Sequence, residues 1–233
     1  MLEQQIKEIV IKMADVYKGR HESKQLKNNV WRGTSTNCSS EFEDLMGELI
    51  GDFFGKEYVV LVSYPLTLRR KQELWTVTKR KNVWRKHDSR EPDILVYRKS
   101  DCKIIAILDL KNDVSRTSDN WIKDANNLRD LMRNAETITY KPKEGEKGSI
   151  EIKYSDDVYY SFVILNAENE HGKLNNYFKE MADSNLPYFI LNTETHLNAV
   201  DKVTEEKINC KENVNQWKEL SRELKQLIQL VQQ

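Results

Sequence analysis

The sequence predicts an α/β fold, with a central mixed β-sheet flanked by helices. Two observations lead to this prediction: segments in which apolar residues recur at helical spacing, and short apolar runs rich in β-branched residues between them. Elements that alternate in this way build layered domains in which helices cover a sheet. At 233 residues the chain is long enough for one hydrophobic core and short for two, so we expect a single domain over residues 1–233.

Two helices and three strands are predicted in the first half of the chain. Apolar residues recur at helical spacing over 2–18 and again over 42–53. Ser39 and Ser40 can cap the second helix, and Gly55 can end it. We expect the centre of the sheet to be formed by three apolar runs of strand length, at 58–64, 94–97 and 104–110.

The second half continues the alternation. A helix with a serine in front of it is predicted over 118–135, followed by a charged loop that contains glycine at 141–148. Further strands are expected at 150–154, 158–165 and 188–191, and further helices at 173–182 and 213–231.

Charge and composition narrow the class of protein. The 37 basic and 37 acidic residues balance, which argues against a simple basic coat protein for nucleic acid. The three cysteines lack the paired spacing of a disulfide framework or a zinc site. No apolar run approaches the roughly 20 residues that cross a bilayer, and residues 1–16 lack the apolar core of a signal peptide. We therefore expect a cytoplasmic protein without membrane contact.

Two aspartates and a lysine lie around a predicted hairpin at 92–111. If its strands pair antiparallel about a turn near Asp101, Asp93 lies opposite Asp109, with the side chains roughly 5 Å apart. Lys111 shares their face because residues two apart on a strand point the same way. Metal-assisted phosphodiester cleavage requires carboxylates that converge on a hard cation and a polar group that acts on water. The hairpin is therefore a candidate metal site.

The context of Asp109 distinguishes it from other acidic residues. Residues 104–108 are apolar at every position, as in a strand covered on both faces, and charge begins abruptly after them. An acid two positions before a lysine is uninformative alone, because the pattern also begins at Glu22, Asp101, Glu151, Glu205 and Glu223. The alternative interpretation is that Asp93 and Asp109 are exposed strand-end residues paired with nearby lysines, an arrangement that contributes little.

Three short motifs together resemble the PD-(D/E)XK nuclease superfamily, which includes most type II restriction enzymes and many repair and recombination nucleases. They are Pro-Asp at 92–93, Asp-Leu-Lys at 109–111 and Ser-Glu-Phe-Glu at 40–43, with a predicted helix after the second motif. The resemblance covers residues 40–135 and implies a restriction-endonuclease-like core.

The resemblance also implies roles for individual residues. Asp93 and Asp109 would hold Mg²⁺, for which Mn²⁺ can substitute, and Lys111 would orient or activate water. A glutamate on the preceding helix would complete the site. By position that glutamate is Glu43, with Glu48 as the second choice.

A basic segment at 65–90 precedes the hairpin. Its nine basic residues stand against two acidic ones, with Trp75 and Trp84 among them. Such combinations suit contact with DNA phosphates, and the alternative is a solvated hairpin whose tryptophans pack on the core. The residues expected to contact DNA are Arg69, Arg70, Lys71, Lys79, Arg80, Lys81, Arg85, Lys86 and Arg90. A second basic region, 18–32, either follows the DNA backbone or is a solvated loop.

The helix at 213–231 carries an apolar stripe that two copies of the chain can share, although a helix packed on its own sheet has the same pattern. Cutting both strands of a duplex usually requires two sites, so a homodimer is expected mainly from function.

The resemblance implies a magnesium-dependent endonuclease that acts on double-stranded DNA, most similar to a sequence-specific type II restriction enzyme. A cognate methyltransferase acting on the same site is then a further candidate partner. One alternative is a structure-selective or non-specific nuclease of repair, recombination or phage defence. Another is a DNA-binding module that keeps the fold without catalysis. No residue excludes RNA as substrate.

Overall fold

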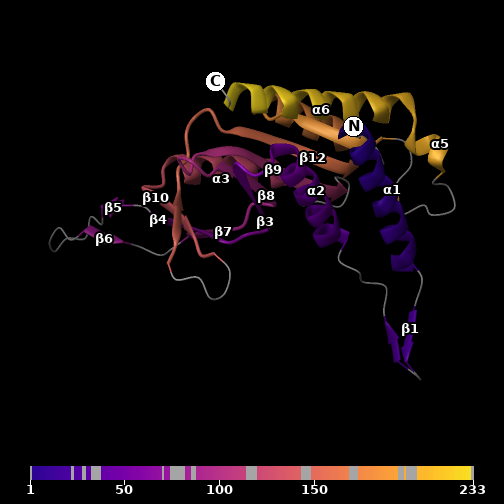
Figure 1. Cartoon of the computed structure of the whole chain (residues 1–233), viewed down its shortest axis with the longest axis horizontal. Coiled ribbons are helices and arrows are strands. Elements are labelled where there is room, and N and C mark those ends of the chain that lie inside the picture. The colour runs from indigo at the N-terminus through magenta and orange to yellow at the C-terminus, as the bar shows by residue number, and fades with distance from the viewer. Residues whose placement is uncertain are drawn as a thin grey trace.

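A five-stranded mixed sheet forms the centre of the computed structural model (Figure 1). Its strands lie in the order β13 (Tyr188–Asn192), β12 (Tyr159–Asn166), β9 (Ile104–Asp113), β8 (Ile94–Arg98) and β3 (Tyr58–Val62). β9, β12 and β13 are parallel, whereas β8 is antiparallel to both of its neighbours, β9 and β3. The predicted α/β class with a mixed central sheet is confirmed.

The structure describes residues 2–21, 24–27, 30–32, 38–69, 71–73, 82–84, 88–113, 120–142, 148–167, 173–193, 197 and 204–231. The side chains of 18–37, 70–90, 173–174 and 231 lie outside this description. Within the described ranges, no helix combines the length and the apolar character needed to cross a bilayer.

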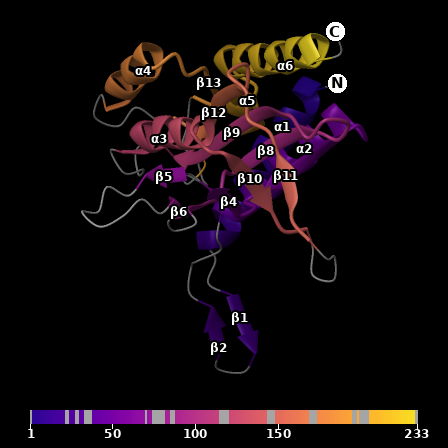
Figure 2. The ribbon, with the colours of Figure 1, turned by 90° about the vertical axis from the view of Figure 1, so that its left-hand side faces the viewer.

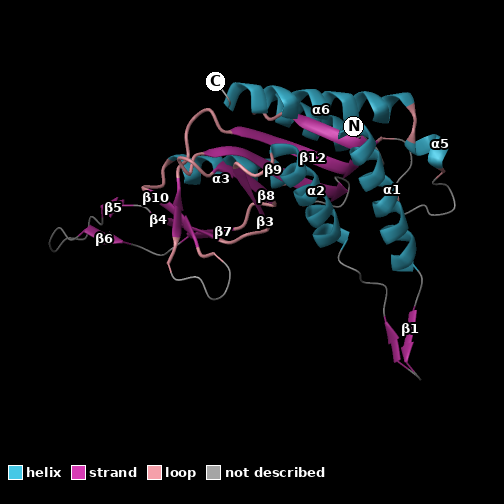
Figure 3. Cartoon of the chain, viewed as in Figure 1, coloured by secondary structure: helices cyan, strands magenta, loops and turns pink. Residues whose placement is uncertain are grey.

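Helices cover both faces of the central sheet (Figures 2 and 3). One face packs against α1 (Leu2–His21), α2 (Cys38–Phe54) and α6 (Lys211–Val231). The other face packs against α3 (Trp121–Arg133), α4 (Lys173–Asp183) and a smaller sheet. The strands of the smaller sheet lie in the order β11 (Ile150–Ile152), β10 (Thr137–Tyr140), β4 (Leu66–Arg69) and β7 (Asp88–Arg90).

The remaining described elements are a short helix, α5 (Glu205–Ile208), and two hairpins. The hairpins are β1 (Lys24–Lys27) with β2 (Val30–Arg32), and β5 (Lys71–Glu73) with β6 (Asn82–Trp84). Both hairpins project away from the central sheet in Figure 1.

β9 is buried on both faces, as its apolar sequence predicts. Every residue from Ile104 to Leu108 is at most 5% exposed. The register with β8 shifts between Val96 and Tyr97, which leaves Ile105 as the extra residue of a bulge, and Ile105 then packs in the same cluster as Ala106. The bulge lies between the turn and the aspartates, so it shifts the pairing there by one residue: without it, Asp93 would lie opposite Leu108 instead of Asp109.

Most predicted elements are present, with small changes at their ends. The strand expected at 58–64 ends at Val62, because Ser63 takes a positive φ of 42° and turns the chain. Ser39 and Ser40 lie inside α2 instead of in front of it, since the helix begins at Cys38. Gly55, with φ of 75°, follows the last residue of α2 as predicted. α3 ends at Arg133 rather than 135, and the serine expected to precede it lies outside the described residues.

Other parts of the prediction were wrong or incomplete. β10 and the hairpin β1–β2, which lies in the second basic region, were not predicted. The segment 65–90 is not simply an insert, because its two ends form β4 and β7 of the smaller sheet. Leu66 and Leu68 of β4 are buried there against the core.

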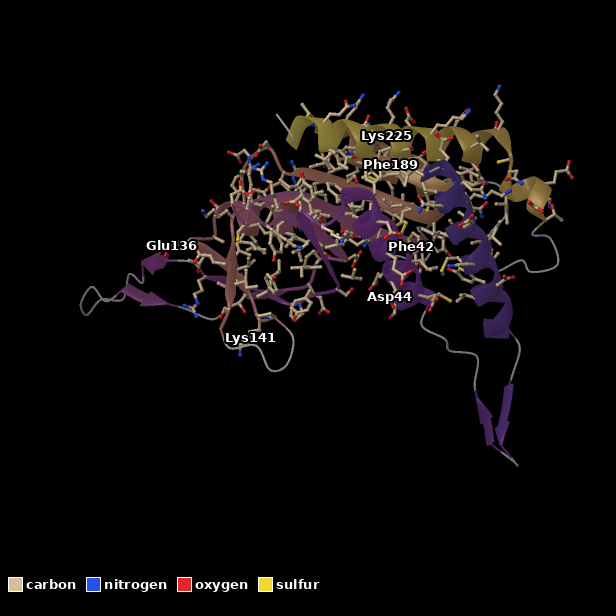
Figure 4. The ribbon with its side chains drawn as sticks, viewed as in Figure 1. Phe42, Asp44, Glu136, Lys141, Phe189 and Lys225 are labelled. Atoms are coloured by element: carbon tan, nitrogen blue, oxygen red, sulfur yellow. The ribbon has the colours of Figure 1, made fainter. Side chains whose placement is uncertain are left out.

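The apolar stripe of α6 packs on its own sheet. Trp217, Leu220, Leu224 and Leu227 are buried in one cluster with β13, and the indole N–H of Trp217 donates a hydrogen bond to the Leu191 carbonyl at 2.8 Å. Phe189 lies beneath this helix, whereas Lys225 is on its exposed side (Figure 4). Intramolecular packing therefore accounts for the stripe, and the expectation of a homodimer depends on function alone.

Candidate metal centre

The pairing of β8 with β9 brings Asp93 next to Asp109. Ile94 lies opposite Leu108 in the register, so one further step along both strands places the two aspartates opposite each other. The carboxylate of Asp93 (Oδ2) accepts a hydrogen bond from the Leu110 amide at 2.6 Å, which fixes it against the end of β9. This is the pairing on which the predicted site depends.

Lys111 lies between the two carboxylates. Its ammonium group forms an ion pair with Asp109 and lies 3.8 Å from Oδ2 of Asp93 and 3.3 Å from the Leu110 carbonyl oxygen. The side chains of Asp93, Asp109 and Lys111 are 25%, 18% and 19% exposed. They are therefore partly buried and mutually paired, unlike the exposed strand-end residues of the alternative interpretation.

Glu43 reaches the same place from α2. Oε2 of Glu43 accepts a hydrogen bond from the Ser63 hydroxyl at 2.5 Å, and the Ser63 amide donates to the Asp93 carbonyl at 2.9 Å. The charge of Glu43 also contributes to the raised pKa of Asp93. Glu48, the second choice, is exposed. The geometry thus favours Glu43 as the helix acid.

Close packing of α2 on β3 explains the position of Glu43. A β-carbon added to Gly47 would lie 2.3 Å from Cγ2 of Val62, so only glycine lets the helix approach the strand this closely. Gly47 is four residues after Glu43 and lies on the same side of the helix. The amino-terminal turn is held as well, because the Asn112 side-chain amide donates to the Ser39 hydroxyl at 2.8 Å.

A buried chain of asparagines fixes β9 just beyond Lys111. The side-chain amide of Asn166 donates to the Asn112 carbonyl at 2.9 Å, and Asn192 donates to Asn166 at 3.1 Å. Asn213 at the start of α6 donates to Asn192 at 3.3 Å. Networks of paired buried polar groups favour one arrangement of their strands, so the carboxyl end of β9 is tied to β12, β13 and α6.

The environment raises the pKa of Asp93 to about 7. Burial is the largest cause, and the charge of Asp109 adds to it, because a low dielectric and a neighbouring negative charge both disfavour a second carboxylate. The charge of Lys111 and the hydrogen bond from the Leu110 amide act in the opposite direction. Perturbed carboxyl groups of this kind concentrate at functional sites.

In metal-free protein, Asp93→Asn is expected to gain stability relative to the wild type as pH rises from about 4 to about 8. The pKa of Asp93 in the folded protein lies above its ordinary value of 3.8, so its contribution to stability is fully present below that value and is lost as pH rises through about 7. Urea unfolding in EDTA across this pH range measures the difference.

Asp101→Asn is the matched control, because the Arg98 hydrogen bond lowers the pKa of Asp101 to about 2. Asp101 contributes to stability above its pKa in the unfolded chain, and this contribution is lost only as pH falls below that value. The difference in free energy of unfolding between this variant and the wild type therefore stays level from about pH 4 to 8. A level difference for Asp93→Asn as well would show that the pKa of Asp93 is not raised in the folded protein.

Tyr160 is a site residue that the sequence did not indicate. It lies on β12, beside β9, and its hydroxyl donates a hydrogen bond to Oδ2 of Asp109 at 3.4 Å. Burial raises its pKa well above the ordinary value, and the charge of Asp109 adds to this. The guanidinium carbon of Arg129, on α3, lies 5.9 Å from the centre of the Tyr160 ring. No signal in the sequence links these residues, because the contact depends on strand order.

The basic segment begins and ends next to the centre. β4 and β7 pair through Leu66 and Arg90, a few residues from Ser63 and Asp93. Arg69 is exposed on β4. The other side chains expected to contact DNA lie outside the described side chains: Arg70, Lys71, Lys79, Arg80, Lys81, Arg85, Lys86 and Arg90.

The donor set at this centre fits a hard divalent cation. In the described ranges, no three acidic, histidine or cysteine side chains lie close enough to hold a metal ion by themselves. The oxygens that surround the Lys111 ammonium come from two carboxylates and the Leu110 carbonyl. Mg²⁺ and Mn²⁺ prefer carboxylate and carbonyl oxygens and keep several waters, so two carboxylates suffice.

Comparisons with known proteins give no relative from which a function can be transferred. No family model matches this chain. No curated protein and no solved structure matches it either.

Proposed function

We propose that this chain is a magnesium-dependent endonuclease with a restriction-endonuclease-like core, which hydrolyses phosphodiester bonds of double-stranded DNA. The observation that supports it best is the convergence of Asp93, Asp109 and Lys111 at the ends of two paired strands. Glu43, linked to Asp93 through Ser63, is the fourth member of the proposed site. Among endonucleases of this kind, we propose a sequence-specific type II restriction enzyme.

Each residue has a separate role in the proposed mechanism. A bound Mg²⁺, or Mn²⁺ in its place, stabilises the negative charge that develops on the phosphate during hydrolysis. Asp93 and Asp109 would hold the cation together with the Leu110 carbonyl. Lys111, once released from its ion pair with Asp109, would donate a hydrogen bond to the attacking water and would favour the loss of its proton to solvent. Glu43 would be the further acid that completes the site around the cation.

The basic segment 65–90 is proposed to bring DNA to this centre. Its two ends lie next to Ser63 and Asp93, so a duplex bound along it passes close to the carboxylates. Arginine and lysine contacts to phosphates supply most of the sequence-independent affinity for DNA. Because both strands must be cut, we propose that two copies act together as a homodimer.

Long unmodified duplex DNA, incubated with the purified protein in Mg²⁺ or in EDTA and resolved on a gel, tests this function. The expected result is discrete fragments in Mg²⁺ and intact DNA in EDTA. A smear, or cutting confined to branched DNA, indicates a non-specific or structure-selective nuclease instead. DNA binding without any metal-dependent product, on DNA from several sources, contradicts the proposal and favours a catalytically silent DNA-binding module.

A further inference from the structure

The two oxygens of the Asp109 carboxylate have different partners. Oδ1 pairs with the Lys111 ammonium, on the side where Asp93 lies, and Oδ2 accepts the hydrogen bond from the Tyr160 hydroxyl. The carboxylate is therefore held from two sides, by a cation on one oxygen and a neutral donor on the other. A carboxylate held by only one partner can rotate about its χ2 torsion, which is broad for aspartate.

The ring of Tyr160 is fixed in place by its surroundings. The residue is 5% exposed, and its ring meets the Phe162 ring edge to face at 6.1 Å between centroids. Arg129 lies over the ring, a geometry in which a cation is attracted to the aromatic face. Trp121, on α3, packs on Phe162 with 4.6 Å between the ring centroids, so it holds the ring on which Tyr160 packs. A hydroxyl on so constrained a ring has one position, and that position is beside Asp109.

We propose that Tyr160 is a positioning residue of the metal centre: its hydroxyl holds Oδ2 of Asp109 and thereby turns Oδ1 toward the cation. This inference rests on the proposed function, because it concerns the same centre. Groups that hydrogen-bond to metal ligands orient them, and their loss typically weakens metal affinity or activity by about 10-fold to 100-fold. Tyr160 acts on the cation only through Asp109.

Tyr160→Phe removes the hydroxyl and leaves the ring in place. We expect it to weaken Mn²⁺ binding, measured by calorimetry or by electron paramagnetic resonance, by about 10-fold to 100-fold. The Mg²⁺ concentration that gives half-maximal cleavage rises by the same factor. At saturating Mg²⁺ the rate largely recovers and the KM for DNA is unchanged, which separates a defect in metal positioning from a general loss of structure.

Tyr159→Phe is the matched control. Tyr159 is the preceding residue of β12, and its half-buried side chain packs with the cluster on the opposite face of the sheet. It loses the same hydroxyl and is expected to bind Mn²⁺ like the wild type. Thermal unfolding of both variants shows whether either substitution disturbs the fold.

The outcomes separate this inference from the proposed function. Wild-type protein that binds no Mn²⁺ and cuts no DNA overturns both. Wild-type protein that binds Mn²⁺ and cuts DNA, with Tyr160→Phe equal to Tyr159→Phe in Mn²⁺ affinity, overturns the positioning role alone. A weakened Mn²⁺ affinity found only in Tyr160→Phe supports it.

Discussion

Replacement of Asp109 by asparagine is expected to reduce magnesium-dependent DNA cleavage on the order of 10³-fold or more. Asp109 would present one carboxylate oxygen to the proposed cation, and an amide lacks the charge that would hold a divalent ion there. The shape of the side chain is kept, so DNA binding in Ca²⁺ should remain close to that of the wild type. Single-turnover cleavage and a gel-shift assay measure the two effects separately.

Asp101→Asn provides a control of the same chemistry in the same hairpin. Asp101 also stands two positions before a lysine, but it lies in the turn and is paired with Arg98 at 2.6 Å. This variant should cleave DNA at the wild-type rate. Equal cleavage by Asp109→Asn and Asp101→Asn means that the acid–lysine motif at 109–111 has no catalytic role.

Replacement of Lys111 by methionine is expected to lower cleavage by about 10²-fold to 10⁴-fold while Mn²⁺ binding persists. Methionine keeps a long flexible stem and removes the charge. Without the ammonium group, Asp93 and Asp109 lose their cationic partner, and the pKa of Asp93 rises further, because Lys111 is one of the groups that lower it. A bound divalent cation then replaces the missing charge, so metal should stabilise this variant more than it stabilises the wild type.

Lys103→Met is the control for this substitution. Lys103 is the lysine that follows Asp101, and it forms an ion pair with Asp157 at 2.8 Å, away from the centre. Its loss should leave cleavage and the effect of Mn²⁺ on thermal unfolding unchanged. Wild-type cleavage by Lys111→Met excludes the role in water activation, whatever its effect on stability.

The sequence predicted the hairpin of the centre because its signals are local. An uninterrupted apolar run followed at once by charge marks a buried strand and its end, and a turn assumed near Asp101 pairs Asp93 with Asp109, as the register extended from Ile94 and Leu108 does. The sequence did not indicate the bulge at Ile105, which separates the pair Tyr97–Ile104 near the turn from the pair Val96–Ala106 beyond it. The bulge shifts the pairing by one residue, and this shift brings Asp93 opposite Asp109, the pairing that the sequence predicted from a turn near Asp101.

The choice between Glu43 and Glu48 needed the tertiary structure. Both residues lie on one predicted helix, and the sequence alone does not show which side of it crosses the neighbouring strand. The close contact between Gly47 and Val62 determines that crossing and brings Glu43 to Ser63. Glycine within a helix usually lowers stability slightly. Here Gly47 allows α2 to approach Val62 of β3 closely.

The contact of Tyr160 with Asp109 and the pairing in the smaller sheet could not be predicted, because both join segments that are distant in the sequence. Tyr160 meets Asp109 only because β12 lies beside β9, and the chain between them includes α3 and two strands of the other sheet. β4 and β7 are short and lie within a strongly basic segment, so their charge concealed their strand character. Pairing between distant, short strands is set by packing, which one sequence does not specify.

The most direct test of the central claim is to locate Mn²⁺ by its anomalous scattering in crystals of the protein. The claim is that the carboxylates of Asp93 and Asp109 hold one divalent cation for phosphodiester hydrolysis. The predicted result is a single strong peak in contact with both carboxylates and the Leu110 carbonyl oxygen, with Lys111 moved away from Asp109. Protein that cleaves DNA with Mn²⁺ but binds the ion elsewhere, with none at these two aspartates, would contradict the claim.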